Sequence, residues 1–397
     1  MEILFDKFIR KIESTDCSFI RSKMANIRWD ARLIGIKGAR GVGKTTLMLQ
    51  YIKENLPMDG SVLYVSLDNI WFAENKLSGM ADEFVKKGGK HLFLDEVHKY
   101  PNWSQEIKNL YDDYSELQIV FTGSSLLEIL NARADLSRRA IVYEIQGLSF
   151  REFLNLKLGL NLEQFTLNEL LSQHTQLARK IVKEVKPLQH FDEYLKSGYF
   201  PFFQEIPELY HQRLEEVVNM ALEIELPLLR KVDISYVPKL KQLLQIISES
   251  VPFIPNVSKL SQRIGINRNT FMSYLFFLQE AHIIRNLYKD ARGITQLQKP
   301  DKIYLENTNF QFAFASANAD QGNLRETFFL NQLNHGHEVE YIDRGDFRVD
   351  RKYVFEIGGK SKSKEQIREA TSGFIAADGL EYGMGNKIPL WMFGFLY

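Results

Sequence analysis

The segment Gly38–Thr45 constrains the fold of this chain more than any other feature of its sequence. It reads GARGVGKT, which fits the pattern G-x-x-x-x-G-K-S/T, and it lies between an apolar run at residues 32–37 and a helical pattern at residues 45–55. Glycines let the backbone curl so that successive N–H groups point at phosphate oxygens, and the start of the next helix adds its positive end. We therefore expect a strand, a phosphate-binding loop and a helix, in that order.

Each residue of this loop has an expected role at a magnesium nucleotide. Lys44 reaches the β and γ phosphates, and the hydroxyl of Thr45 ligates the magnesium ion. The expected nucleotide-binding residues are Gly38, Ala39, Arg40, Gly41, Val42, Gly43, Lys44, Thr45 and Thr46.

Short apolar segments alternate with helical patterns up to about residue 150. The further strands are expected at residues 61–67, 91–94 and 117–121, and the further helices at residues 80–87, 103–112 and 125–132. This alternation predicts an α/β fold with a parallel sheet that is covered on both faces. Residues 3–12 have helical apolar spacing and are expected to form a flanking helix.

A second motif follows the strand at residues 91–94, where Asp95 and Glu96 end an apolar run. Asp95 would hold the magnesium ion through a water molecule. Glu96 would be the catalytic base that polarises the attacking water, because that role needs a carboxylate near the metal but not on it. At the end of the next strand, Thr122 and Ser124 are candidates to touch the γ-phosphate or orient the water, and a plain turn is the alternative.

Two further positions have a functional and a structural interpretation. Arg138 and Arg139 follow a run of small and polar residues, and an arginine supplied to the γ-phosphate of a neighbouring subunit accelerates hydrolysis. That role requires a homo-oligomer, and a surface salt bridge is the alternative. Trp29 could lie against the base of the nucleotide, but packing is the expectation.

Composition limits the number of domains, the cellular compartment and the classes of partner that we expect. A chain of 397 residues exceeds one ordinary core, so two or three domains are expected. Lys plus Arg and Asp plus Glu both number 50, so a nucleic-acid contact would need a local basic patch. Cys17 is the single cysteine, which excludes an intrachain disulfide. No apolar run approaches the roughly 18 to 20 residues of a membrane helix, so we expect a cytoplasmic protein with no membrane partner.

From Phe150 onward helical patterns dominate, and two prolines within residues 251–255 indicate a hinge or linker. Residues 256–275 read as a helix, a turn and a second helix, with Ser258 and Asn267 as the expected N-caps. Residues 283–288 would form the first strand of a wing.

This helix-turn-helix has two candidate partners. The side chains able to reach DNA bases or phosphates are Lys259, Arg263, Arg268 and Asn269. The segment is not strongly basic, so protein docking or a purely structural role is the alternative.

The tail beyond residue 300 mixes strands with one expected helix and carries a pattern of acids. Restriction-type nucleases build a magnesium site from an acid on a helix, an acid ending a strand and an E-x-K on the next strand. Here the last element is E-x-x-x-K, with Gly358 where the lysine belongs, so Lys360 or Lys362 would have to replace it. The candidate residues are Glu326, Asp350, Glu356 and Lys360. We expect a retained fold with a binding role rather than catalysis.

The runs GARGVGKTTL, LDEVHKYPNW, FTGSS and GLSFREFL, in this order, resemble a large bacterial and archaeal family of AAA-type ATPases. The core of that family is joined to a C-terminal domain of unknown function. YLKSGYFP at residues 194–201 resembles a further element of the family, with Tyr199 in place of its second glycine. The resemblance implies ATP as the nucleotide and Ser124 as a sensor. Arg139 would be the family's arginine, although Arg138 replaces the usual preceding glycine. A winged helix and an often degenerate nuclease-like fold are also implied.

The prediction is an α/β P-loop ATPase core followed by helical and small α/β parts. The expected domains are a helical flank at 1–30, the AAA-type ATPase at 31–150, a helical connector at 151–250, a winged helix at 251–299 and a nuclease-like domain at 300–397. Hydrolysis of ATP with Mg²⁺ would switch the C-terminal parts. Two functions stay open: a nucleotide-switched DNA-binding factor, or a signalling or scaffolding ATPase that binds a protein partner.

Overall fold

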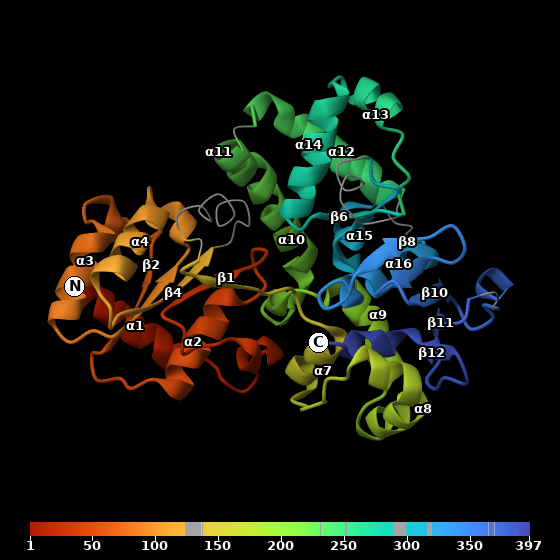
Figure 1. Ribbon diagram of the computed structural model, residues 1–397, viewed down its shortest axis with the longest axis horizontal. Coiled ribbons are helices and arrows are strands. Elements are labelled where there is room, and N and C mark those ends of the chain that lie inside the picture. The colour runs from red at the N-terminus through yellow and green to blue at the C-terminus, as the bar shows by residue number, and fades with distance from the viewer. Residues whose placement is uncertain are drawn as a thin grey trace. The chain divides into compact units, whose positions relative to one another are not determined.

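The computed structural model of the chain (Figure 1) describes residues 1–123, 136, 138–230, 232–250, 252–289, 299–315, 320–363, 365–368 and 370–397. The chain forms two compact units, Met1–Gly147 and Leu148–Tyr397. The sequence-based divisions at residues 250 and 299 both fall inside the second unit. No helix of the described residues is long and apolar enough to cross a membrane. The helix expected at residues 125–132 lies outside the described residues.

The first unit is built on a five-stranded parallel sheet in the order β2-β3-β4-β1-β5. Its strands are β1 (Leu33–Lys37), β2 (Val62–Ser66), β3 (His91–Asp95), β4 (Gln118–Gly123) and β5 (Ile141–Glu144). The central strands β3, β4 and β1 are buried along almost their whole length, as in a parallel sheet covered on both faces. The α/β fold predicted from the sequence is confirmed.

Helices precede and connect these strands. They are α1 (Glu2–Ser14), α2 (Lys44–Asn55), α3 (Leu77–Lys86) and α4 (Trp103–Asp113), with short 3-10 turns η1 (Ser22–Asn26), η2 (Ile70–Ala73) and η3 (Val97–Lys99). Helix α1 packs beside α2 and strand β2 and buries Leu4, Phe8 and Ile12 (Figure 1). Because all five strands run in one direction, their carboxyl ends meet at one edge of the sheet, where the functional residues are expected.

The second unit begins with a helical half. Its helices are α7 (Phe150–Leu158), α8 (Leu167–Glu184), α9 (Pro187–Ser197), α10 (Tyr210–Met220), α11 (Leu226–Arg230) and α12 (Val237–Glu249). Shorter turns are η4 (Pro201–Gln204), η5 (Pro207–Leu209), the π-turn η6 (Ala221–Glu225) and η7 (Ile234–Tyr236). Ser149 and Thr166 start α7 and α8 with reciprocal capping boxes, which satisfy the first free N–H groups of each helix.

The last turn of this unit, η10 (Leu390–Phe395), packs against its first helix, α7. The N–H of Phe165 donates to the carbonyl of Phe395 at 2.9 Å. The hydroxyl of Ser149 donates to the backbone oxygen of Tyr397, 248 residues away, at 2.7 Å. The shared aromatic core contains Phe150, Phe153, Phe191, Tyr194, Phe328 and Phe395. The two ends of the unit's sequence therefore meet in one core.

A helix-turn-helix lies in the middle of the unit. It consists of α13 (Val257–Ile264) and α14 (Arg268–Glu280), and an antiparallel pair follows, β6 (Ile284–Leu287) and β7 (Lys302–Leu305). Asn267 caps α14 as predicted. The prediction for α13 is wrong, because Asn256 and not Ser258 accepts the bond from the free N–H of Lys259.

Strand β7 also holds the segment that the sequence suggested as a hinge. Phe253 and Ile303 exchange two backbone hydrogen bonds, at 2.9 and 2.8 Å, so the described part of this segment is attached to β7. Nearby, Arg285 donates to the buried carboxylate of Glu306 at 2.7 Å. Burial pushes the pKa of Glu306 up, but Arg285 and His282 outweigh it and lower this pKa to about 2.

The end of the chain forms a five-stranded mixed sheet in the order β12-β11-β10-β9-β8. The strands are β8 (Val339–Tyr341), β9 (Phe347–Val349), β10 (Tyr353–Gly358), β11 (Gly373–Ala377) and β12 (Lys387–Pro389). β10, β11 and β12 run parallel, whereas β8 and β9 are antiparallel to their neighbours. Two helices precede it rather than the one expected, α15 (Thr308–Phe314) and α16 (Gln321–Leu333), and Phe329 of α16 packs on Phe347 and Phe355.

Candidate functional site

The loop between β1 and α2 curls tightly, and its glycines make that possible. Gly41 and Gly43 have φ angles of 83° and 93°, a region that side-chain-bearing residues rarely adopt. A Cβ on Gly38 would lie 2.1 Å from the backbone oxygen of Ile145, so this position also has no room for a side chain. The glycine pattern of the sequence therefore corresponds to a loop whose backbone is shaped to face a ligand.

Lys44 begins α2 and folds back over this loop. Its buried ammonium donates to the carbonyls of Gly38 and Ala39 at 2.9 and 2.8 Å. The positive charge is thus held at the mouth of the loop, beside the start of α2, where an anion is favoured.

Arg21, which sequence reasoning missed, braces the same loop from behind. Its buried guanidinium donates to the carbonyl of Val42 at 2.9 Å and to those of Gln146 and Gly147 at 3.0 and 2.9 Å. One cation therefore links the phosphate-binding loop to the last residues of the first unit. Nothing in the local sequence around Arg21 signals this, because its partners lie 21 to 126 residues away.

Asp95 lies at the carboxyl end of β3, beside the start of α2. Its Oδ2 accepts from the hydroxyl of Thr45 at 2.8 Å. Its Oδ1 accepts from the hydroxyl of Thr122 and from the N–H of Glu96 at 3.1 Å. β4 lies between β3 and β1 in the sheet, so Thr122 stands between the loop and the two acids. The structure brings these sequence-predicted residues together at one edge.

Glu96 follows in a left-handed backbone conformation, with φ 53°. Its carboxylate lies 3.5 Å from Nε2 of the buried His98. Burial, together with the positive charges of Lys99, Lys44 and Arg40, lowers the pKa of His98 to about 3. His98 is therefore neutral near pH 7, and it meets Glu96 as a polar neighbour without neutralising the charge of that carboxylate.

The donor set fits a magnesium ion that is held mainly by nucleotide phosphates. Mg²⁺ keeps several waters and uses one or two protein groups in such sites, and Thr45 and Asp95 are one hydroxyl and one carboxylate in direct contact. Within the described part of the chain, no group of three or more His, Cys, Asp or Glu side chains is arranged to hold a metal ion by itself. That arrangement suits an ion that arrives with its nucleotide.

The remaining predictions for this unit have different outcomes. Arg139 forms a two-pronged ion pair with Asp112 of its own chain, at 3.0 and 3.1 Å, which is the surface salt bridge that the sequence allowed. The finger role stays a prediction. Trp29 stacks on Tyr51 and its carbonyl accepts from Gln118, at the amino end of β4, so it lies at the sheet edge opposite the loop. Ser124 lies outside the described residues.

In the second unit, the residues proposed for DNA contact lie at the surface. Lys259, Arg263, Arg268 and Asn269 are all exposed. Lys259 lies in the first turn of α13 and Arg263 near its end, whereas Arg268 and Asn269 lie in the first turn of α14. The later turns of α14 present no cation, because the residues that lie fully or partly at the surface there are Met272, Ser273, Phe276, Phe277 and Gln279.

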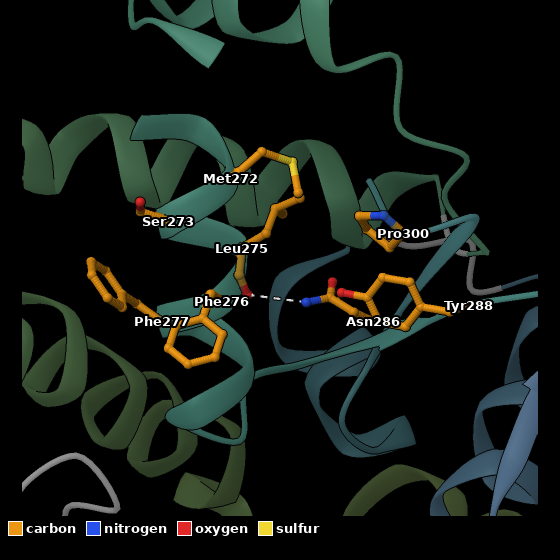
Figure 2. A pocket seen from close by; sticks show the side chains of 8 residues that line it. All are labelled: Met272, Ser273, Leu275, Phe276, Phe277, Asn286, Tyr288 and Pro300. Atoms are coloured by element: carbon orange, nitrogen blue, oxygen red, sulfur yellow. Dashed lines mark hydrogen bonds between the residues drawn. The ribbon is translucent and has the colours of Figure 1, made fainter. Parts of the chain in front are cut away.

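A cavity of about 250 Å³ lies between this part of α14 and strand β6 (Figure 2). It is lined by Met272, Ser273, Leu275, Phe276, Phe277, Asn286, Tyr288 and Pro300. Figure 2 shows the amide of Asn286 donating to the carbonyl of Leu275, at 3.3 Å. Among the residues that the structure describes, the buried oxygen of that amide has no hydrogen-bond partner. The lining is therefore mainly apolar and aromatic, with the amide of Asn286 as a polar group.

The end sheet carries a buried group of acids that only partly matches the prediction. Glu326 of α16 accepts from Tyr304 at 2.7 Å, and Glu356 of β10 pairs with Lys362 at 2.5 Å. The third acid is Asp346, which accepts from the N–H of Ile357. Burial and the mutual repulsion of these carboxylates raise the pKa of Glu326 and Glu356, and burial raises that of Asp346.

Two predicted members do not join this group. Asp350 follows β9, whereas Asp346 precedes it, so the two acids lie about 13 Å apart along the strand at roughly 3.3 Å per residue. The carboxylate of Asp350 instead contacts the ring of His337 at 2.7 Å. Asp346 is the acid opposite Glu356, because Phe347 pairs with Phe355 in the antiparallel register. Lys362, and not Lys360, supplies the ammonium.

Two stretches of the chain match families of known proteins. Residues 30–154 match the family model of an AAA domain, and residues 188–319 match that of a domain of unknown function. An uncharacterized protein of Methanocaldococcus jannaschii is 26% identical over 402 residues, covering 92% of this chain and 84% of that protein.

Two solved structures are among the proteins to which the chain is similar. The Walker-type ATPase of Pyrococcus abyssi has 12% identity and a TM-score of 0.39, covering 78% of this chain and 94% of that one. AMPPCP-bound DnaA from Aquifex aeolicus has 16% identity and a TM-score of 0.26, covering 65% and 84%. The parallel sheet and the glycine loop between β1 and α2 thus lie within the stretch that matches the AAA domain model.

Proposed function

We propose that the protein is a magnesium-dependent ATP hydrolase that acts as a nucleotide-driven switch. The observation that carries this proposal is the meeting of Lys44, Thr45, Asp95 and Glu96 at the carboxyl edge of the parallel sheet. Hydrolysis of a γ-phosphate needs a loop that binds the phosphates, a hydroxyl and a carboxylate at the metal, and a second carboxylate that activates water.

Each side chain has a separate task in this mechanism. The loop N–H groups and the ammonium of Lys44 bind and orient the phosphates. Mg²⁺, when bound with the nucleotide, would neutralise charge that develops on the phosphate oxygens. Thr45 would ligate the metal through a lone pair of its hydroxyl oxygen, and Asp95 would hold a metal-bound water. Glu96 would accept the proton of the attacking water, with His98 beside it as a neutral neighbour.

The test separates nucleotide binding from hydrolysis. Lys44→Ala should abolish nucleotide binding, whereas Glu96→Gln should bind ATP normally and lose about 10²- to 10⁴-fold in turnover. Lys86→Ala and Glu83→Gln are matched controls, because both side chains are exposed on α3 and form only surface ion pairs. A Glu96→Gln chain that hydrolyses ATP at the normal rate would show that the base has been misassigned.

We further propose that the helix-turn-helix binds a partner, and two classes remain. Its exposed cations, Arg263 and Arg268 among them, support DNA. The apolar cavity beside Phe276 supports a protein partner that inserts an apolar or aromatic side chain. Binding of a DNA duplex that weakens steeply with salt and with Arg268→Ala would favour DNA. No duplex binding at low salt would eliminate DNA and leave the protein partner.

For the acids of the end sheet we propose a binding or structural role and no nuclease activity. The ammonium of Lys362 already pairs with Glu356, and Lys302 lies 3.8 Å from Glu326, so two cations offset the carboxylates. The chain should not nick plasmid DNA in Mg²⁺ or Mn²⁺. Nicking that is lost in Glu356→Ala and kept in Lys44→Ala would overturn this proposal.

A further inference from the structure

A tyrosine on the strand next to β3 contacts the carboxylate assigned to magnesium. Tyr64 lies in β2, is only 3% exposed, and its hydroxyl donates to Oδ2 of Asp95 at 2.7 Å. The parallel register pairs Ser66 with Asp95, so Tyr64 lies two residues before the end of the neighbouring strand and its long side chain reaches forward to the acid. This contact was not foreseen from the sequence.

The N-terminal helix fixes the direction of this bond. The ammonium of Lys11, on α1, donates to the hydroxyl of Tyr64 at 3.0 Å and lies 4.9 Å from the centre of its ring. Phe8, one turn earlier, stacks on the same ring at 6.5 Å. An ammonium has no acceptor, so the hydroxyl must accept from Lys11 and give its own proton to Asp95.

Asp95 accepts hydrogen bonds on both of its carboxylate oxygens. Tyr64 and Thr45 donate to Oδ2, whereas Thr122 and the N–H of Glu96 donate to Oδ1.

The consequence appears when the metal site is completed. For the role proposed above, Thr45 ligates the metal through a lone pair of its hydroxyl oxygen, and the hydroxyl proton can still be donated to Oδ2 of Asp95. Tyr64 is the second donor to Oδ2 and has no role at the metal itself, so it holds the carboxylate in one orientation while Thr45 engages the ion. Groups that orient metal-binding residues in this way typically change metal affinity by about 10- to 100-fold when they are removed.

We propose that Tyr64, supported by Lys11, is a positioning residue that aims Asp95 at the magnesium ion, so that helix α1 is part of the nucleotide site. The proposal rests on the proposed function of Asp95. It assigns to Lys11 on helix α1 an effect on metal binding that acts through Tyr64, beyond the flanking role expected for this helix.

The experiment measures metal dependence without requiring turnover. The affinity for a fluorescent ATP analogue, N-methylanthraniloyl ATP, is measured in EDTA and then at increasing Mg²⁺. In Tyr64→Phe, affinity in EDTA should stay within about twofold, while the Mg²⁺ concentration for half-maximal tightening should rise about 10-fold. Lys11→Met, at an exposed position, should also raise this Mg²⁺ concentration, by a smaller factor. Tyr114→Phe is the matched control, because its hydroxyl donates to Asp82 on the surface at 2.8 Å.

The outcomes distinguish this proposal from the one it rests on. A wild-type chain whose nucleotide affinity does not respond to Mg²⁺ would overturn both. A wild-type chain that responds, with Tyr64→Phe responding identically, would overturn the positioning role alone. Because Lys11→Met removes only an exposed ammonium, a shift in that variant supports the role even if Tyr64→Phe is poorly folded.

Discussion

Replacing Arg21 by methionine should destabilise the first unit and weaken nucleotide binding together. Methionine keeps the length and the apolar stem but removes the guanidinium that binds three carbonyls. The bonds to Val42 and Gly147 are buried, and a buried carbonyl left unpaired costs about 1–3 kcal/mol. The carbonyl of Gln146 is part-buried and can turn to water. At about 1.5 kcal/mol for each buried acceptor, the loss is about 3 kcal/mol.

This loss can be measured by calorimetric unfolding of the full chain. About 3 kcal/mol corresponds to a fall of roughly 6–12 °C in the melting temperature of a unit of about 150 residues. Arg28→Met is the matched control, because Arg28 pairs with Asp30 on the surface, with side chains 74% and 70% exposed. Such pairs contribute about 0–1 kcal/mol. If Arg21→Met melts like Arg28→Met and binds nucleotide normally, the bracing role assigned to Arg21 is wrong.

Three further predictions concern both units. The folded chain lowers the pKa of Glu306 from 4.5 to about 2, so the ionised carboxylate stabilises the folded state at any pH above the unfolded value of 4.5. This contribution to the free energy of unfolding, about 3 kcal/mol, should be lost as the pH falls from about 5 to 2. Glu306→Gln should not show this loss of stability in an acid-unfolding experiment. Chemical denaturation should show that Asn267→Ala lowers the free energy of unfolding by about 1 kcal/mol and that Ser258→Ala leaves it almost unchanged. The reason is that Asn267 caps α14, whereas the cap of α13 is Asn256 and not Ser258. Gly38→Ala should lose nucleotide binding, because its Cβ would displace the loop from Ile145; normal affinity would contradict the proposed tightness of this turn.

The part of the site that was predictable is the part that is local in sequence. Lys44 and Thr45 lie in one short loop, and Asp95 and Glu96 directly follow a buried strand, so spacing alone placed them. Parallel strands then bring their carboxyl ends to one edge. The α/β class followed from the same alternation of strands and helices.

The residues that were missed act over long separations. Lys11 binds Tyr64 53 positions away, and Arg21 binds Gly147 126 positions away. Each is an ordinary residue in its local pattern, a lysine on a helix surface, a tyrosine in an apolar strand or an arginine in a loop. Their roles come from strand order and helix packing, which periodicity does not specify.

The end sheet shows a different limit. Asp346 and Asp350 flank the same three-residue strand, and the sequence did not distinguish them until the antiparallel register was known. Likewise, Lys362 reaches Glu356 because the chain turns after Gly358, so a lysine outside the expected spacing occupies the place beside the acid.

The contact between α7 and η10 has a consequence for how the protein is made. About 240 residues separate these two segments, and at a synthesis rate of about 5–20 residues per second that is roughly 12–48 s. During this interval the aromatic face of α7, with Phe150 and Phe153, has been made but lacks its partner Phe395. The first unit is complete at Gly147 and can fold while synthesis continues. The aromatic face of α7 therefore stays without its contact to η10 until the last residues of the unit are made, and transiently exposed apolar surface of this kind favours aggregation.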